Sequence, residues 1–275
     1  STPLYSSAAS DVYKRQMFSC ALGLHSNASD NFYLQDSNSK TCYIVDLKTL
    51  LNSRRFVPDE QFRYSSEVLP TSDLCLLDDN RYIGYHMWYL DDKQFSKVDS
   101  PIGYYQKGED SGKGMDDFPF FVASVNGARL FKNPQTQELW TADMHRDAIR
   151  IYNDSLKQIR ELVGPDHFSP EYTRRQIDAP VAFVTFADEC DYHAYTDYYI
   201  TDKHIYLVYE GNKHFDMKNL SPVEIFKLDF DGNLLCNYKL DRYVYSISIN
   251  KKEDTLYCAS RPSVMEPPVI LKYKL

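Results

Sequence analysis

The fold is decided by two neighbouring stretches, His204-Ile-Tyr-Leu-Val-Tyr-Glu-Gly211 and Val223-Glu-Ile-Phe-Lys-Leu-Asp-Phe-Asp-Gly-Asn-Leu-Leu-Cys-Asn-Tyr-Lys-Leu240. The first stretch is rich in aromatic and β-branched residues, which favour strands. The second predicts a hairpin of two strands that turns at Asp231-Gly232. After that turn, one face alternates with the period of a packed strand and carries Leu234, Cys236, Tyr238 and Leu240.

The same pattern of a short strand followed by an alternating hairpin recurs about five times. The repeats are expected near Phe18–Val57, Glu67–Gly108, Phe118–Val163, Val181–Leu240 and Tyr243–Leu275. In the first repeat, we predict a strand over Asn31–Asp36 and a hairpin around Cys42–Arg55. Repeats of this length that contain only strands indicate radial repetition. The predicted fold class is therefore all-β: a β-propeller of four-stranded antiparallel blades.

The two ends of the sequence differ from the repeats. Residues 1–16 have neither a strand period nor a helix period; the run Ser6–Gln16 looks like translated adapter sequence, and we expect residues 1–16 to be an adapter-derived or disordered segment outside the fold. Residues 17–275 are expected to form one propeller domain. Its last unit supplies only three strands, near Tyr243–Asn250, Thr255–Ser260 and Val269–Leu275, so we expect an incomplete ring that lacks part of the natural N-terminus.

Composition bounds the possible functions. The chain has 275 residues and is 43% hydrophobic, which is enough for a sizeable core. Its net charge of -8 argues against a nucleic-acid groove, because phosphate binding needs clustered Lys and Arg. No window approaches the roughly 18 apolar residues of a membrane span. We therefore expect no nucleic-acid partner and no transmembrane segment.

The six cysteines lie far apart and form no C-x-x-C pair, which argues against a zinc site or a redox dithiol. Several occupy apolar strand positions. We predict buried free thiols, because free cysteine packs like a small hydrophobic residue, although disulfides remain an open alternative.

Two connections resemble each other in sequence, Val57-Pro-Asp-Glu-Gln-Phe62 and Val163-Gly-Pro-Asp-His-Phe168, and each is expected to leave a hairpin toward the next blade. The plain interpretation is one shared turn, in which proline fixes φ and aspartate caps. Together with the blade pattern, the Gly-Pro-Asp-x-Phe connection resembles the TolB-like six-bladed propellers, found as uncharacterised secreted lipoproteins of Gram-negative gut bacteria. The resemblance covers about residues 18–275. It implies six blades, of which five are visible, and a periplasmic or cell-envelope location.

Propellers place the loops that follow each second strand, and those that precede each first strand, around one mouth of the central channel. The residues at these strand ends are aromatic, basic or imidazole-bearing, which is the chemistry of a ligand site. We predict a ligand-binding rim that contains His86, Trp88, His145, Arg146, Tyr209, Glu210 and Arg261. The alternative for the two tryptophans, Trp88 and Trp140, is packing in the core or between blades.

A second cluster is Asp188-Glu-Cys-Asp-Tyr-His193. Asp188, Glu189, Asp191 and His193 could hold Ca²⁺ or a transition metal, and calcium-dependent lactonases use this kind of fold. A solvated acidic loop is the favoured interpretation, because no matching Glu, Asn and Asp set is seen at other strand ends.

Other catalytic motifs are missing from the sequence. Gly108–Asp117 has the wrong glycine spacing for a phosphate loop, and no G-x-S-x-G elbow is present. We therefore expect a non-catalytic propeller that needs no cofactor and binds a protein, peptide or glycan at its rim in the bacterial cell envelope. The alternatives are a Ca²⁺-type metal-dependent hydrolase or lactonase and a structural scaffold for protein interaction.

Overall fold

The structure is a computed structural model. It describes residues 21–26, 31–36, 41–53, 58–63, 71–78, 81–86, 93–99, 102–107, 127–170, 172–176, 182–186, 192–211, 216, 218–263 and 265–275.

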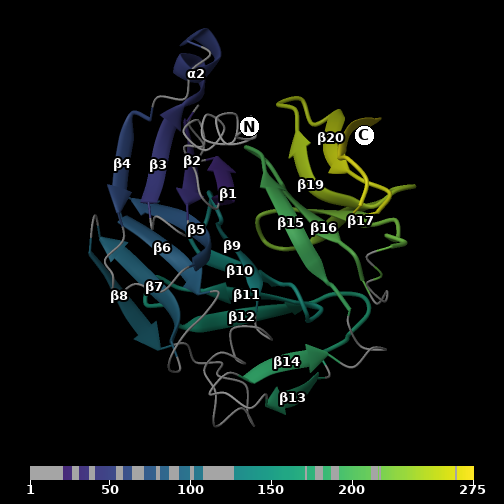
Figure 1. Ribbon diagram of the computed structural model, residues 1–275, viewed down its shortest axis with the longest axis horizontal. Coiled ribbons are helices and arrows are strands. Elements are labelled where there is room, and N and C mark those ends of the chain that lie inside the picture. Colours follow the sequence, from purple (N-terminus) through teal and green to yellow (C-terminus); the bar gives the residue numbers. More distant parts are fainter. Residues whose placement is uncertain are drawn as a thin grey trace, which may run out of the picture.

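Five antiparallel sheets form the blades (Figure 1). Blade 1 contains β1 (Ala21–Ser26), β2 (Asn31–Asp36), β3 (Thr41–Asp46) and β4 (Glu60–Arg63). Blade 2 contains β5 (Thr71–Asp78), β6 (Arg81–His86), β7 (Lys93–Asp99) and β8 (Ile102–Lys107). Blade 3 contains β9 (Ala128–Lys132), β10 (Leu139–Asp143), β11 (Ala148–Tyr152) and β12 (Gln158–Val163). Blade 4 contains β15 (Tyr195–Ile200), β16 (Ile205–Tyr209), β17 (Glu224–Leu228) and β18 (Leu234–Lys239). Blade 5 contains β19 (Val244–Ile249), β20 (Thr255–Ser260) and β21 (Val269–Lys274).

The first strand of each blade is the innermost one. Within the described residues β1 contacts β5, β5 contacts β9, β9 contacts β15 and β15 contacts β19, so the blades follow one another around a common centre (Figure 1). This arrangement confirms the predicted all-β propeller of antiparallel blades. It also brings the starts of the first strands and the ends of the second strands to one face of the molecule.

The apolar core lies between the blades rather than within any one of them. Three clusters of buried side chains each draw their members from two neighbouring blades. Representative members, one from each side of the three interfaces, are Ile83 and Leu130, Trp140 and Leu207, and Ile225 and Ile247. Because both faces of a middle strand meet another blade, β10, β11 and β16 are buried at every position and do not alternate.

The outer strands alternate, as the sequence predicts. Cys236, Tyr238 and Leu240 are half-buried in or beside β18, whereas Leu234 is 56% exposed. The last sheet contains three strands among the described residues, and β21 shows the exposure of an outer strand.

Blade 1 differs from the predicted hairpin around Cys42–Arg55, because a short helix, α2 (Leu47–Ser53), follows β3. The Asp46 carboxylate accepts a hydrogen bond from the Thr49 amide (2.6 Å), which caps the first turn of this helix. That hydrogen bond is the main reason that the pKa of Asp46 lies below its usual value. The fourth strand is β4, which begins after Asp59. The described part of the predicted connection, residues 58–62, therefore leads into β4 of blade 1, and the prediction that it leaves a hairpin toward the next blade is wrong; Val57 lies outside the described residues.

Blade 4 begins later than predicted. The segment after Val181 forms β14 (Ala182–Phe186), which pairs with β13 (Tyr172–Gln176) in a separate two-stranded sheet. The first strand of blade 4 is β15 instead. The alternation of the sequence could not show whether β14 or β15 begins blade 4, because both strands are rich in aromatic residues and similar in length.

Four cysteines, Cys42, Cys75, Cys236 and Cys258, are free thiols, as predicted. Burial raises the pKa of the Cys42 and Cys258 thiols to about 12, so both are protonated and unreactive near neutral pH. Cys20 and Cys190 lie outside the described residues, as does the segment 1–16.

Candidate functional site

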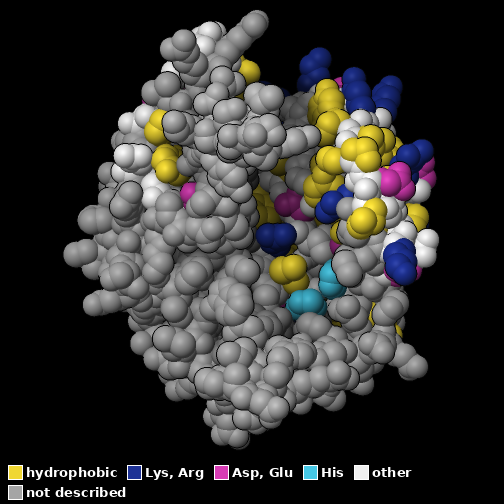
Figure 2. All heavy atoms as spheres, viewed as in Figure 1, with side chains coloured by type: hydrophobic (Ala, Val, Ile, Leu, Met, Phe, Trp, Pro, Cys, Tyr) yellow, Lys and Arg dark blue, Asp and Glu magenta, His cyan; other side chains and the backbone are white. Residues whose placement is uncertain are grey.

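A line of polar side chains crosses three consecutive blades at one face of the propeller. His145 follows β10 in blade 3, His193 and Glu210 flank β15 and β16 in blade 4, and Tyr243 precedes β19 in blade 5. We call these four residues the rim cluster. In the recessed middle of the face shown in Figure 2, histidine side chains (cyan) lie close to basic (dark blue) and acidic (magenta) ones.

Direct contacts connect the rim cluster. The His145 and His193 rings meet edge to face, with their centroids 5.4 Å apart. His193 Nδ1 lies 3.5 Å from Glu210 Oε2, and the Tyr243 hydroxyl donates to Glu210 Oε1 (3.2 Å). Backbone hydrogen bonds fix the same region, because the Ala194 amide donates to the Met144 carbonyl and the Glu210 amide donates to the Ala194 carbonyl (2.7 and 2.8 Å). Backbone hydrogen bonds at the interface between blades 3 and 4 therefore fix the positions of these side chains.

Burial sets the protonation of this cluster. Desolvation, followed by the nearby His193 ring, lowers the pKa of His145 to about 4. His145 is consequently a neutral imidazole near neutral pH and can both donate and accept a hydrogen bond. Burial, and then the Glu210 carboxylate, raises the pKa of Tyr243 above its usual value, so its hydroxyl remains a donor.

Arg146 lies beside the rim cluster and is oriented by a buried acid. Its Nη1 is 3.1 Å from Asp143 Oδ2, and Arg150 Nη1 is 3.2 Å from the same oxygen. Arg150 Nε also contacts Glu161 (3.2 Å). Two guanidinium groups therefore share one buried carboxylate, which fixes Arg146 with about one-fifth of its side chain exposed (18%) at the rim.

Asp147 supports the rim from beneath. Its Oδ2 accepts hydrogen bonds from the Asp166 and His167 amides (2.6 and 2.8 Å), and its Oδ1 accepts one from the Tyr195 hydroxyl (3.2 Å). The Gly-Pro-Asp-x-Phe connection thus closes over Asp147. A side chain at Gly164 is impossible here, because a Cβ would lie 1.8 Å from Asp147 Oδ1.

Tyr209 and Trp140 face the core. Tyr209 is 2% exposed, its ring stacks on Phe226 with centroids 4.6 Å apart, and its hydroxyl donates to Asp166 (2.8 Å). Trp140 is fully buried in the cluster between blades 3 and 4, as the packing interpretation predicts. Because both rings are buried, neither offers a surface on which a ligand could stack. Tyr209 instead packs beneath the rim, between Phe226 and Asp166.

Arg261 follows β20 directly and lies at the same face as Tyr243. Its guanidinium carbon is 5.1 Å from the centroid of the Tyr245 ring. Of the predicted rim residues, the structure therefore brings His145, Arg146, Glu210 and Arg261 to one face.

Most of the remaining residues predicted for the rim or for a metal site have side chains outside the described part of the structure. The backbone of His86 ends β6, but its side chain lies outside the described residues, as do Trp88, Asp188, Glu189 and Asp191. Of the proposed metal ligands only His193 is described, and it belongs to the rim cluster. Within the part of the chain that the structure describes, no group of three or more His, Cys, Asp or Glu side chains is arranged to hold a metal ion.

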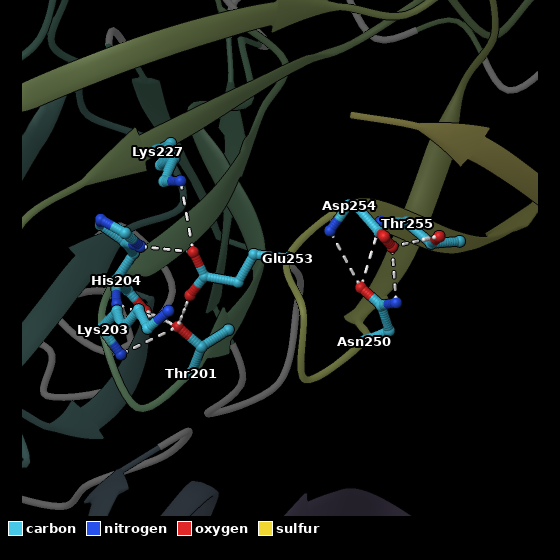
Figure 3. A network of polar contacts seen from close by, with 8 residues as sticks. All are labelled: Thr201, Lys203, His204, Lys227, Asn250, Glu253, Asp254 and Thr255. Atoms are coloured by element: carbon cyan, nitrogen blue, oxygen red, sulfur yellow. Dashed lines mark hydrogen bonds and ion pairs between the residues drawn. The ribbon is translucent and has the colours of Figure 1, made fainter.

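A second polar network lies at the opposite ends of β15 and β19 (Figure 3). The Glu253 carboxylate contacts His204 Nδ1 (2.6 Å), Lys227 Nζ (3.3 Å) and the Thr201 hydroxyl. Burial opposes the charge of Glu253, but the hydrogen bonds from Thr201, His204 and Lys227 together lower its pKa. Since every oxygen of this carboxylate is used to connect blades 4 and 5, we interpret the network as structural.

Sequence analysis missed three important residues. It grouped His193 with the acidic loop before it, and it did not select Tyr243 or Asp147. Tyr243 immediately precedes a first strand, so the rule on strand ends could have found it. Asp147 carried no comparable signal, because its partners lie 19 to 48 residues away in sequence.

The blades and their arrangement around a common centre define a β-propeller. Residues 30–252 match the family described as TolB-like 6-blade propeller-like. The chain belongs to this family. The fold is one that generally supports binding or scaffold roles. No curated protein sequence matches the chain.

Several solved structures share the fold. A member of the duf4221 family from Bacteroides vulgatus is 9% identical with a TM-score of 0.51, over 94% of this chain and 80% of that one. Kuenenia stuttgartiensis hydrazine synthase is 9% identical with a TM-score of 0.47, over 86% of this chain, which spans only 55% of that one. Virginiamycin B lyase from Staphylococcus aureus is 10% identical with a TM-score of 0.44, over 93% of this chain and 84% of that one. Identities this low show similarity of fold alone.

Among the described residues, no helix is long and apolar enough to cross a membrane.

Proposed function

We propose that this chain is a non-catalytic propeller of the bacterial cell envelope that binds a peptide or glycan ligand at the rim of its central channel. The supporting observation is the continuous line of contacts from His145 through His193 and Glu210 to Tyr243. Side chains from three blades converge there, and all of them can exchange hydrogen bonds with a ligand. The envelope location rests on the family.

The chemistry of the rim favours a ligand rich in hydroxyl and amide groups. His145 is neutral, Tyr243 keeps its proton, and Arg146 is already balanced by Asp143. These groups suit neutral hydrogen-bonding partners, whereas a highly charged polyphosphate would meet the Glu210 and Asp143 carboxylates.

The test is a thermal-shift screen of the full chain against panels of glycans and short peptides. A ligand that binds only the native state raises the melting temperature by mass action. We expect at least one panel member to do so. We expect His145→Ala and Glu210→Gln to reduce its shift by more than half, whereas Lys252→Ala, in an exposed turn at the opposite face, keeps it.

A shift that all three variants retain would place the ligand elsewhere and would contradict the proposal. No shift with any compound, together with capture of a protein that does not depend on His145 or Glu210, would favour the scaffold function instead.

A further inference from the structure

Arg261 carries a charge that no described residue balances with an ion pair. Its Nε is buried and has no hydrogen-bond partner among the residues that the structure describes. A buried donor without an acceptor is costly, and more so when it is charged. Nearby Arg146 differs, because Asp143 balances it.

A β-bulge positions this guanidinium. In the pairing of β19 with β20, Val244 lies opposite Ser260 and Ser246 lies opposite Ala259, so Tyr245 is the extra residue. Bulges turn one side chain out of the regular alternation of a strand. Here the bulge brings the Tyr245 ring beneath the Arg261 guanidinium, 5.1 Å from its carbon. Stacking on an aromatic face holds the planar group while it leaves the N–H edge available.

Arg261 adjoins the rim cluster through Tyr243. The hydroxyl of Ser260, the residue before Arg261, donates to the Tyr243 carbonyl (2.6 Å), and the Tyr243 hydroxyl reaches Glu210. The positive charge of Arg261 also acts on the Tyr243 phenol, where it partly opposes the rise in pKa that burial causes. A ligand that contacts the rim cluster can therefore contact Arg261 as well.

We propose that Arg261 binds a carboxylate group of the rim ligand, with Tyr245 holding the guanidinium in place. This inference rests on the proposed function and identifies the chemical class of the ligand. A carboxylate supplies two oxygens in the plane of the guanidinium and accepts two parallel N–H hydrogen bonds. Its single negative charge matches the single positive charge of Arg261, whereas Glu210 disfavours a more highly charged group.

Two sources could supply this carboxylate: an acidic sugar or the C-terminus of a peptide. Matched probes distinguish them. One pair is a trisaccharide whose only acidic unit is one terminal galacturonate and its methyl ester, and the other is an N-acetylated tripeptide with neutral side chains and its C-terminal amide. Each pair differs mainly in the charge of one chemical group, so a difference in affinity within a pair reports on the carboxylate.

Calorimetric titration of the full chain with these four probes tests the inference. We expect one acid to bind at least about tenfold more tightly than its neutral partner, the loss typical of a charged hydrogen bond. We expect Arg261→Gln to remove that preference and Tyr245→Leu to weaken it. Tyr245→Phe, which keeps the ring, and Lys252→Gln, a matched loss of charge at the opposite face, should both retain it.

Equal binding of acid and neutral probes, or a preference that Arg261→Gln leaves intact, would overturn the inference. The proposed function would still stand if His145→Ala abolished binding of the neutral probe. The comparison within the wild-type chain also tests the inference if Arg261→Gln does not fold, because an absent preference for the acids overturns it without any variant.

Discussion

At the scale of single residues, aspartate side chains add hydrogen bonds between neighbouring blades to the apolar contacts. Asp147 is 1% exposed and satisfies two amides of the connection after blade 3 and the hydroxyl of Tyr195 in blade 4. Asp197 performs a related task one interface further on, where its Oδ2 accepts a hydrogen bond from the Ile247 amide of blade 5 (2.8 Å). Side chains thus complete contacts that sheet hydrogen bonds cannot make between separate blades.

Replacing Asp147 should destabilise the protein without changing the composition of the rim. Asp147→Ala leaves the amides of Asp166 and His167 without their acceptor, which should cost about 3 kcal/mol of unfolding free energy. Chemical denaturation followed by circular dichroism measures this loss. Asp154→Ala, in an exposed turn, is the control and should change the free energy by less than about 0.5 kcal/mol. Equal effects of the two variants would show that the connection does not depend on Asp147.

Asp197 should make stability depend on pH. Burial, only partly offset by the hydrogen bond from Ile247 and the charge of Arg129, raises its pKa from 3.8 to about 6. The native state therefore binds this proton more tightly than the unfolded state, and the contribution of Asp197 to stability falls as pH rises from about 4 to about 6. Asp197→Asn keeps an oxygen for the Ile247 amide but carries no charge.

We therefore expect Asp197→Asn to be more stable than the wild-type chain at about pH 8, with the difference vanishing near pH 4. Melting temperatures of both proteins across this range provide the measurement. A constant difference at every pH would mean that the charge of Asp197 is not responsible.

At the scale of elements, turns at the opposite face connect neighbouring blades. Glu253 adopts a positive φ of 56° in the turn between β19 and β20, which a non-glycine residue rarely does. This conformation accompanies the contacts of its carboxylate with Thr201, His204 and Lys227 of blade 4 (Figure 3). The turn therefore uses local backbone strain to gain an interaction between blades.

Glu253→Gln should lower stability by about 1–2 kcal/mol near neutral pH, because the amide keeps one acceptor but loses the charge that faces His204 and Lys227. Since the native pKa of Glu253 lies below its ordinary value of 4.5, this stabilisation is present above that pH and is lost as pH falls through the native pKa. Denaturation curves at about pH 7 and pH 3.5 should show a gap that is smaller in acid. Glu266→Gln, at an exposed position, should show no gap at either pH; an undiminished gap in acid would contradict the assignment.

The local sequence pattern predicts the regular hairpins of the blades well. It predicts poorly the features that depart from the regular blade, such as the helix in blade 1. Alternation and turn residues such as Asp231-Gly232 locate the outer hairpins of blades 3 and 4, because each hairpin is a local structure. In blade 1, the cap from Asp46 and the leucines of α2 favour a helix where the alternating pattern suggested a strand. At the candidate site, the rule on strand ends finds His145 and Glu210. It cannot show that His193 joins them, because that contact depends on how two blades pack.

At the scale of the whole molecule, stability is shared between neighbours. Each core cluster belongs to two blades, so blades 2 to 5 bury apolar side chains against their neighbours. The loss of one interface therefore exposes the middle strands of both blades beside it. In such an arrangement, a defect in blade 5 should affect unfolding that is observed in blade 3, through blade 4.

Leu256→Ala tests this coupling. Leu256 is fully buried between blades 4 and 5, so its truncation should cost about 2–5 kcal/mol. Trp140, between blades 3 and 4, becomes the only indole in a Trp88→Phe background, because the chain has two tryptophans. We expect Leu256→Ala to lower the transition seen by Trp140 fluorescence and that seen by far-ultraviolet circular dichroism equally, and Ile270→Ala, 73% exposed, to lower neither. If the circular dichroism transition splits while Trp140 keeps its original midpoint, blade 5 unfolds independently. The rim between blades 4 and 5, where the Tyr243 hydroxyl donates to Glu210, would then open before the rest of the propeller.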